Sequence, residues 1–266
     1  MRLNLIVATA FAFLFAASAS QAESWSNEFK NFTGCRFEPV LDMQPNSMQL
    51  VADPANPDNP NTVLAFSVTP KKCIGNDCNH QSVRSALAQC REGNHPKELW
   101  YGWEMFLPKD FPHDGQQIRG FQQFAEWKDQ DQCGIASTAV DAYTGSDFLE
   151  WVLHVPTGKK PGQFGGDCQQ VKNFPLARVS SILGKWVKFE LYAVWSKGSD
   201  GRFELYVDGA KRVNYSGPTC VNCDQRNGAI FGNYLCCTPD SKAVLPSTVY
   251  YRSISSAPKR EELIWD

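Results

Sequence analysis

Alternation of apolar and polar side chains, repeated in several short segments, is the strongest constraint on how this chain folds. In Trp186–Trp195 the apolar residues fall at every second position, and Phe148–Val155 shows the same pattern. Successive side chains of a β-strand point to opposite faces of a sheet, so this period predicts strands with one buried face. Helical periodicity is nearly missing, apart from short turns expected near Leu183 and Pro258–Leu263. We therefore predict an all-β fold, a two-sheet antiparallel β-sandwich of the jelly-roll, concanavalin-like type, stabilised by disulfides.

Further strands are predicted on the same grounds, and turn signals separate them. Asp208-Gly209 lies between two of these segments and is a strong hairpin signal. Residues 23–62 are polar and rich in Pro and Asn, so we expect a turn-heavy connection there. The other expected strands are Thr62–Thr69, Gln81–Gln89, Leu99–Leu107, Phe121–Lys128, Phe203–Val207, Lys211–Tyr215 and Thr248–Ile254.

The beginning of the chain has the features of a secretory signal peptide. Arg2 supplies a positive charge, Leu5–Ala17 is a short apolar run, and Ser20-Gln21-Ala22 offers small residues for cleavage. A membrane anchor is disfavoured because the apolar run is too short to span a bilayer. We expect residues 1–22 to be removed and the protein to be secreted or periplasmic, with residues 23–266 forming a single domain.

The overall charge excludes some classes of partner. The formal net charge is −2, so bulk charge provides no grip on a polyanion. Nucleic acid and membrane surfaces are therefore not expected as partners, and recognition of an acidic substrate would depend on a few focused cations. We expect a monomer.

All ten cysteines follow the signal peptide, and an even count in an exported chain indicates disulfides. Cys73 with Cys78 is a plausible local loop, whereas the adjacent Cys236 and Cys237 are expected to pair with other cysteines. The Cys220-Val-Asn-Cys223 motif has an alternative interpretation as half of a zinc site, but a second half with suitable spacing is missing. No cofactor is expected, and a structural Ca²⁺ is left open.

The segment Trp100–Lys128 directs attention to carbohydrate. We interpret it as two strands of an aromatic-rich sheet joined by a Pro-containing loop. At strand spacing Gln122, Glu126 and Lys128 share one face. A sheet face with acid, base and amide groups beside aromatic rings has the composition of a sugar-binding cleft.

Four segments together resemble the β-jelly-roll polysaccharide lyases, the group that includes glucuronan lyases, heparin lyase I and alginate lyases. Trp100–Pro112 resembles a strand and loop of that group, and Phe121–Lys128 lies where its members place a Gln-x-His or Gln-x-Lys pair. Trp186–Gly209 resembles the hairpin of the group, and Phe231-Gly232-Asn233-Tyr234 resembles the late strand that carries its catalytic tyrosine. The resemblance implies cleavage of a uronic-acid-containing polysaccharide by β-elimination, with an acidic polysaccharide as partner.

The resemblance also implies roles for particular residues. Elimination requires neutralisation of the C6 carboxylate, removal of the C5 proton and protonation of the departing O4. Arg84, within Val83-Arg84-Ser85-Ala86-Leu87, matches an arginine that would grip the uronate. Tyr234 would donate a proton to O4 and is a candidate for the base as well. The other implied residues are Lys128 and His154 as proton-transfer groups, and Gln122 or Asn233 as hydrogen-bond partners of the carboxylate.

Two departures keep other functions open. Ala86 stands where the family has a Glu beside the arginine, and Glu126 stands where Gln is expected. Moving the match to Gln123 restores the Gln but puts Ala125 at the base position, which fits less well. An ionised Glu126 repels a uronate unless Lys128 or Arg84 neutralises it. The first alternative is a non-catalytic module that binds acidic glycans on the same sandwich. The second is a glycoside hydrolase with Glu126 and Glu150 as its carboxylate pair.

Overall fold

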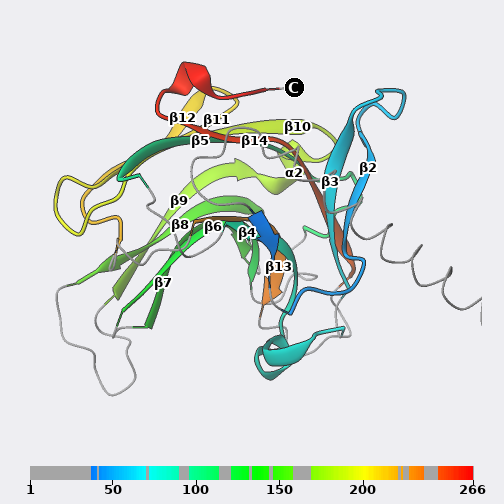
Figure 1. The fold of residues 1–266 in the computed structure, drawn as a ribbon, viewed down its shortest axis with the longest axis horizontal. Coiled ribbons are helices and arrows are strands. Elements are labelled where there is room, and N and C mark those ends of the chain that lie inside the picture. Colours follow the sequence, from blue (N-terminus) through cyan, green and yellow to red (C-terminus); the bar gives the residue numbers. More distant parts are fainter. Residues whose placement is uncertain are drawn as a thin grey trace, which may run out of the picture.

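The structure is a computed structural model that describes residues 37–40, 42–69, 72–89, 96–113, 121–131, 134–143, 146–157, 169–220, 223, 228–236 and 245–265. The predicted signal peptide lies outside these residues. Within them, the strands form two seven-stranded antiparallel sheets that pack face to face (Figure 1). The predicted two-sheet, all-β sandwich is therefore confirmed.

Each sheet combines segments from both halves of the chain. Sheet A has the order β1 (Phe37–Pro39), β4 (Val83–Gln89), β13 (Ala229–Cys236), β6 (Phe121–Asp131), β7 (Gly134–Tyr143), β8 (Phe148–Pro156) and β9 (Gln169–Arg178). Sheet B has the order β12 (Ala210–Ser216), β11 (Arg202–Val207), β10 (Trp186–Val194), β5 (Glu98–Phe106), β14 (Ser247–Ala257), β3 (Thr62–Val68) and β2 (Met48–Ala52). The helical elements in the described part are short: η2 (Gly75–His80), α2 (Val179–Ile182) and η4 (Arg260–Glu262). None of the described helices has the length and apolarity to cross a membrane.

Aromatic side chains from both sheets fill the space between them. Trp103 of β5 stacks on Phe189 of β10 with ring centroids 5.1 Å apart, and it meets Trp127 of β6 at 6.0 Å. Trp127 continues the contact to Trp151 of β8 at 5.8 Å. Each ring buries a large apolar area, and offset or tilted aromatic pairs add further stabilisation. This core fixes the position of the central strands of sheet A.

Two expectations about the strands are wrong. Trp100–Lys128 does not supply two strands of one sheet, because β5 lies in sheet B and β6 in sheet A. Alternation defines a strand but does not say which sheet receives it. Residues 23–62 are also more than a connection, since β1 and β2 lie there as edge strands. Both strands are short and are separated by turn residues, so the alternation of apolar and polar side chains is weak there.

The hairpin and the local disulfide agree with the sequence. Asp208 and Gly209 both have positive φ, 47° and 77°, as a two-residue hairpin turn with right-handed strand twist requires. Cys73 and Cys78 form a disulfide. Cys236 is also disulfide-bonded, with a partner outside the described residues.

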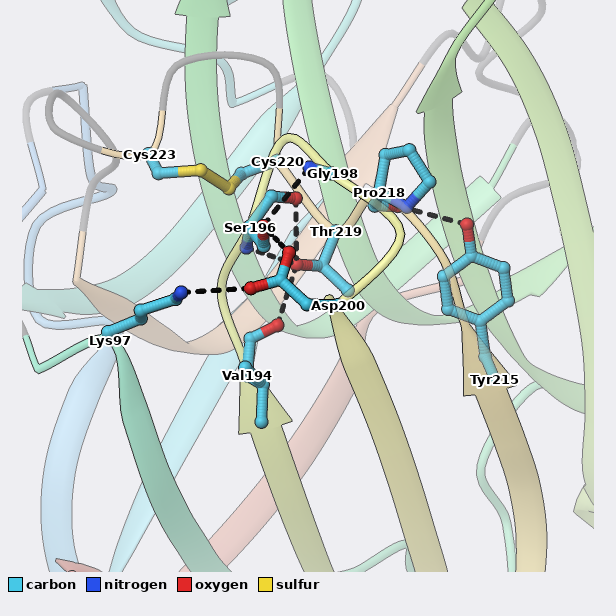
Figure 2. The surroundings of a disulfide bond; sticks show 10 residues. All are labelled: Lys97, Val194, Ser196, Gly198, Asp200, Tyr215, Pro218, Thr219, Cys220 and Cys223. Carbon is cyan, nitrogen blue, oxygen red and sulfur yellow. Dashed lines mark hydrogen bonds and ion pairs between the residues drawn. A yellow bond between two sulfur atoms is a disulfide. The ribbon is translucent and has the colours of Figure 1, made fainter.

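The second local disulfide settles the zinc alternative. Cys220 and Cys223 are bonded to each other, so their sulfurs are not metal ligands (Figure 2). The disulfide follows Thr219, whose hydroxyl accepts a bond from the backbone N–H of Ser196 and donates one to the carbonyl of Val194, each at 2.8 Å. Among the described residues, no group of three or more His, Cys, Asp or Glu is arranged to hold a metal ion.

Candidate active site

A pocket lies on the outward face of sheet A, where β4, β13 and β6 run side by side. Both sheets arch in the same direction and sheet A lies on the inner side of the arch, so its outward face is concave (Figure 1). The pocket encloses about 350 Å³ of empty space that includes open solvent. It is lined by Val40, Arg84, Ala86, Gln123, Phe124, Glu126, Ile230, Gly232, Asn233 and Tyr234.

A β-bulge decides which residues of β6 face this pocket. The pairing of β6 with β7 shifts between Gln123 and Ala125, so Phe124 is an extra residue in the strand. Gln123 pairs with the outward-facing Tyr234, and beyond the bulge Glu126 pairs with Ile230. Gln123 and Glu126 are consequently consecutive outward side chains, although they are three positions apart in sequence.

The prediction that Gln122 shares a face with Glu126 is therefore wrong. Gln122 is buried between the sheets, where its amide N–H donates to Asn233 Oδ1 at 2.6 Å and to Ser247 Oγ at 2.9 Å. The Asn233 amide in turn donates to the backbone carbonyls of Ser247 at 3.1 Å and Phe66 at 3.3 Å. Both amides connect sheet A to sheet B, and we no longer assign them to substrate binding.

A tyrosine from sheet B supports the bulge from behind. Tyr251 is fully buried, and its hydroxyl faces the carbonyls of Phe124 at 2.8 Å and Gly232 at 2.7 Å. Burial raises the pKa of Tyr251 well above its ordinary value, so the hydroxyl remains a donor. A buried carbonyl without a partner is costly, so this contact stabilises the irregular pairing.

Among the described residues that line the pocket, Arg84 is the one with a cationic side chain. Its Nε donates to Asp77 Oδ2 at 2.6 Å, and its Nη2 donates to Asp77 Oδ1. Burial alone would lower the pKa of Arg84, but the hydrogen bond and charge of Asp77, together with electrostatic interactions with Tyr234 and Glu126, raise it. The side chain of Arg84 keeps 27 % of its surface exposed, whereas that of Asp77 keeps 2 %. The guanidinium is held from behind and remains accessible from the pocket.

Tyr234 lies next to this cation. The guanidinium carbon of Arg84 is 4.8 Å from the centroid of the Tyr234 ring, within the range of a cation–π contact. The Tyr234 hydroxyl donates to Ser82 Oγ at 3.2 Å. The two residues that the family resemblance selected most directly, Arg84 and Tyr234, thus occur together, as paired neighbours on β4 and β13.

Small residues keep the floor of the pocket open. Gly232 faces Ala86 across the β13–β4 pair. A Cβ atom at Gly232 would approach the Ser85 carbonyl oxygen to 2.3 Å and Ala86 Cβ to 2.5 Å. A side chain at position 232 would therefore displace β4, so glycine is required here by close strand approach.

The remaining predicted site residues lie further away or are not described. Lys128 pairs with Ser137 through the backbone, and its side chain lies outside the described part of the structure. His154 is on β8 with Nδ1 3.2 Å from Gln169 Oε1. Three strand spacings, about 14 Å, separate β8 from β13. The structure does not bring His154 into contact with Tyr234.

The carboxylate pair of the hydrolase alternative is also separated. Glu126 and Glu150 are not on adjacent strands as expected, because β7 lies between β6 and β8. Their register places the two backbones about 12 Å apart across β7, so they are not the neighbouring-strand pair on which the hydrolase alternative depends. Glu150 also accepts a bond from Asn173 of β9 at 2.9 Å, on the side away from Glu126.

The sequence does not assign three residues of the site. Aligning the Gln of the family pair with Gln123 puts Ala125 at the base position, so Gln123 is not selected, and the bulge that turns Gln123 outward has no local sequence signal. Asp77 and Ser82 contact Arg84 and Tyr234 from the segment that precedes β4. The one available signal is their position, in or just after the loop between Cys73 and Cys78.

Comparison with known proteins agrees with the fold and identifies a family. A sequence model of the family described as polysaccharide lyase matches residues 21–243. The crystal structure of an endo-β-1,4-glucuronan lyase from the fungus Trichoderma reesei is similar, with a TM-score of 0.59, 16 % identity, and coverage of 85 % of this chain and 93 % of that chain. The alginate lyase vAL-1 from Chlorella virus has a TM-score of 0.52, 13 % identity, and coverage of 86 % and 94 %. No curated protein sequence matches significantly.

Proposed function

The chain belongs to the polysaccharide lyase family, and from that premise we propose that it cleaves a uronic-acid-containing polysaccharide by β-elimination in the pocket of sheet A. The observation that carries the proposal is the placement of the Arg84 guanidinium 4.8 Å from the centroid of the Tyr234 ring, within one pocket. A fixed cation beside a phenol supplies two of the three groups that the elimination requires.

Arg84 and Gln123 would bind the C6 carboxylate of the uronate. The exposed side of the guanidinium faces the pocket, and the Gln123 amide lies on the paired position next to Tyr234. Neutralising the carboxylate makes the C5 proton more acidic, because negative charge develops there when the proton leaves. Gln123 takes the role first assigned to Gln122 and Asn233.

Tyr234 would protonate O4. In the elimination a base removes the C5 proton, the C5–H electron pair forms a C4=C5 double bond, and the C4–O4 bond breaks while O4 gains a proton. Tyr234 supplies that last proton, and Tyr234 or Lys128 accepts the first. We do not retain His154 as the base because of its distance from the pocket.

Glu126 gives the pocket a second charge. It is buried in the lining, and its charge contributes to the raised pKa of Arg84, so the two groups interact. The repulsion between Glu126 and a uronate is therefore offset in part by Arg84. The two similar solved structures are lyases of glucuronan and alginate, which are both polyuronates, and this supports the same substrate class.

Product formation tests the proposal directly. The mature protein is incubated with glucuronan, alginate and heparin-type polymers, and absorbance of the C4=C5 double bond is followed in the ultraviolet. We expect an absorbance rise on at least one polymer. No rise on any polymer, with the circular dichroism of a folded β-protein, would overturn the proposal. Binding without cleavage, unchanged in Tyr234→Phe, would select the non-catalytic glycan-binding module.

Export of the protein is a related proposal. The disulfides Cys73–Cys78 and Cys220–Cys223 support an oxidising compartment. We expect the mature chain to begin at Glu23, and N-terminal sequencing of exported protein checks this. A retained N-terminal segment in the exported protein would contradict it.

A further inference from the structure

One short segment between Cys73 and Ser82 contacts both Arg84 and Tyr234. Asp77 binds the guanidinium of Arg84 through both carboxylate oxygens. Ser82 Oγ accepts the hydrogen bond of the Tyr234 hydroxyl at 3.2 Å. The two groups to which we assign the chemistry therefore take their orientation from the same ten-residue stretch.

The shape of this segment is fixed by several local contacts. The Cys73–Cys78 disulfide closes it with a Cα–Cα distance of 5.0 Å around the turn η2. The backbone N–H of Asp77 donates to the carbonyl of Ile74 at 3.2 Å, and that of Ser82 donates to the carbonyl of Asp77 at 2.9 Å. The Asp77 carboxylate is buried, so its position follows that of the turn.

Asp77 supplies the carboxylate partner of Arg84 that the family has at the position of Ala86. The family resemblance expects a carboxylate at position 86, two residues after the arginine and on the same face of β4. Ala86 instead forms part of the pocket floor, and the carboxylate reaches Arg84 from η2. Since Asp77 takes the Nε side of the guanidinium, the Nη1 side is left for a ligand.

Removal of Asp77 would change where Arg84 points. Glu126 lies in the same pocket and already interacts with Arg84 by charge. Without Asp77, Glu126 becomes the carboxylate that attracts the guanidinium, and an Arg84–Glu126 pair would occupy the place of the uronate carboxylate. The contact with Asp77 thus keeps the cation free for substrate.

We propose that the disulfide-closed segment Cys73–Ser82 is a positioning element of the reaction, with Asp77 acting through Arg84 and Ser82 acting through Tyr234. This inference rests on the proposed function. It makes activity dependent on the Cys73–Cys78 disulfide, although neither cysteine is among the residues that line the pocket. Reduction of this disulfide therefore lowers turnover while the sandwich stays folded.

A double-mutant cycle tests the action of Asp77 through Arg84. We expect Asp77→Asn to lower kcat/KM by about 10-fold or more, the size of a lost hydrogen bond to a charged group. In the Arg84→Ala background the same change should have no further effect, because its target is gone. Asp77→Glu should restore part of kcat/KM. Equal losses in both backgrounds would show a general structural role and overturn the proposal.

A matched pair of cysteine variants tests the disulfide. Cys73→Ser/Cys78→Ser should lower kcat by about 10-fold or more, while Cys220→Ser/Cys223→Ser, which opens a similarly short loop away from the pocket, should keep kcat within about two-fold. Both are assayed well below their melting temperatures. Equal kcat in the two variants would overturn the inference.

Failure of the positioning inference can be distinguished from failure of the proposed lyase function. If the wild-type protein cleaves no polyuronate, the proposed function fails. If the wild-type protein is active and the Cys73/Cys78 variant is equally active, the positioning inference alone fails. Should that variant not fold, the Asp77 cycle decides the question without it.

Discussion

The two faces of sheet A at β6 and β13 carry similar polar residues with opposite roles. On the outward face the polar side chains border an open pocket, and the members are Gln123, Glu126, Tyr234 and Arg84. On the inward face Gln122 and Asn233 bind each other, Ser247 and the backbone of sheet B, while Tyr251 of sheet B contacts the backbone of sheet A from the same side.

The two faces differ in whether their polar side chains find hydrogen-bond partners within the protein. The inward amides are almost completely buried, with exposures of 1 % for Gln122 and 0 % for Asn233, and their bonds are made within the protein. On the outward face Arg84 keeps part of its donor set directed to the pocket. A buried polar group must be paired internally, whereas a group that binds substrate must retain bonding capacity. The strand pairing must therefore be known before a polar side chain of a strand can be assigned to binding or to stability.

The largest expected effect is on the outward face. Tyr234→Phe keeps the ring under Arg84 but removes the proton donor, so we expect kcat to fall by about 10² to 10⁴-fold. Initial rates of ultraviolet absorbance give kcat, and thermal melting checks the fold. A variant with wild-type kcat would remove Tyr234 from the chemistry and break the contrast between the two faces.

Adjacent glutamines give the sharpest matched test. We expect Gln123→Ala to lower kcat/KM by about 10 to 100-fold with little change in stability, because a bond to the substrate carboxylate is lost. Gln122→Ala should lower the free energy of unfolding by about 2 kcal/mol, since Asn233 and Ser247 lose a buried partner. Denaturant unfolding and steady-state kinetics measure the two effects. The reverse assignment of effects would show that the bulge is misplaced.

Tyr251 should make the free energy of unfolding depend on pH. Its pKa is raised in the folded protein by burial, so the hydroxyl titrates in the unfolded chain first, near pH 10. The stability from this group is complete below about pH 10 and is lost as pH rises above it. We expect Tyr251→Phe to cost about 1 to 3 kcal/mol at neutral pH and to reduce the decline of unfolding free energy above pH 10 by up to about 1.4 kcal/mol per pH unit.

Unfolding free energies of both proteins at neutral pH and between about pH 10 and 11 test this prediction. The other tyrosines with raised pKa values, Tyr192, Tyr215 and Tyr250, are present in both proteins, so the difference isolates Tyr251. Parallel pH curves would contradict a buried, protonated hydroxyl behind the bulge.

The smallest expected effect is at His154. It lies on the concave side but three strands from Tyr234, so His154→Ala should change kcat by less than about two-fold. Kinetics on the best substrate measure it. A loss of more than about 10-fold would mean that the functional surface of sheet A extends to β8.

Much of the fold and part of the site follow from sequence. Strand alternation identified most of the strands, and the short spacing of Cys73 and Cys78 made plausible the local disulfide that the structure shows. Arg84 and Tyr234 were selected by resemblance, and the structure places them in contact. Gln122 was placed on the wrong face because a local pattern assumes a regular strand, and Asn233, which the resemblance selected, is buried between the sheets.

The sequence by itself determined the period of the strands, and it indicated a short Cys73–Cys78 loop and, through the family resemblance, a cation at Arg84 and a phenol at Tyr234. These are local properties, encoded by side-chain alternation and short spacing. Only the tertiary structure decided which glutamine faces the pocket and which carboxylate holds Arg84. Those choices depend on Tyr251 behind the bulge and on Asp77 in η2, whose contacts form only when separate segments pack together.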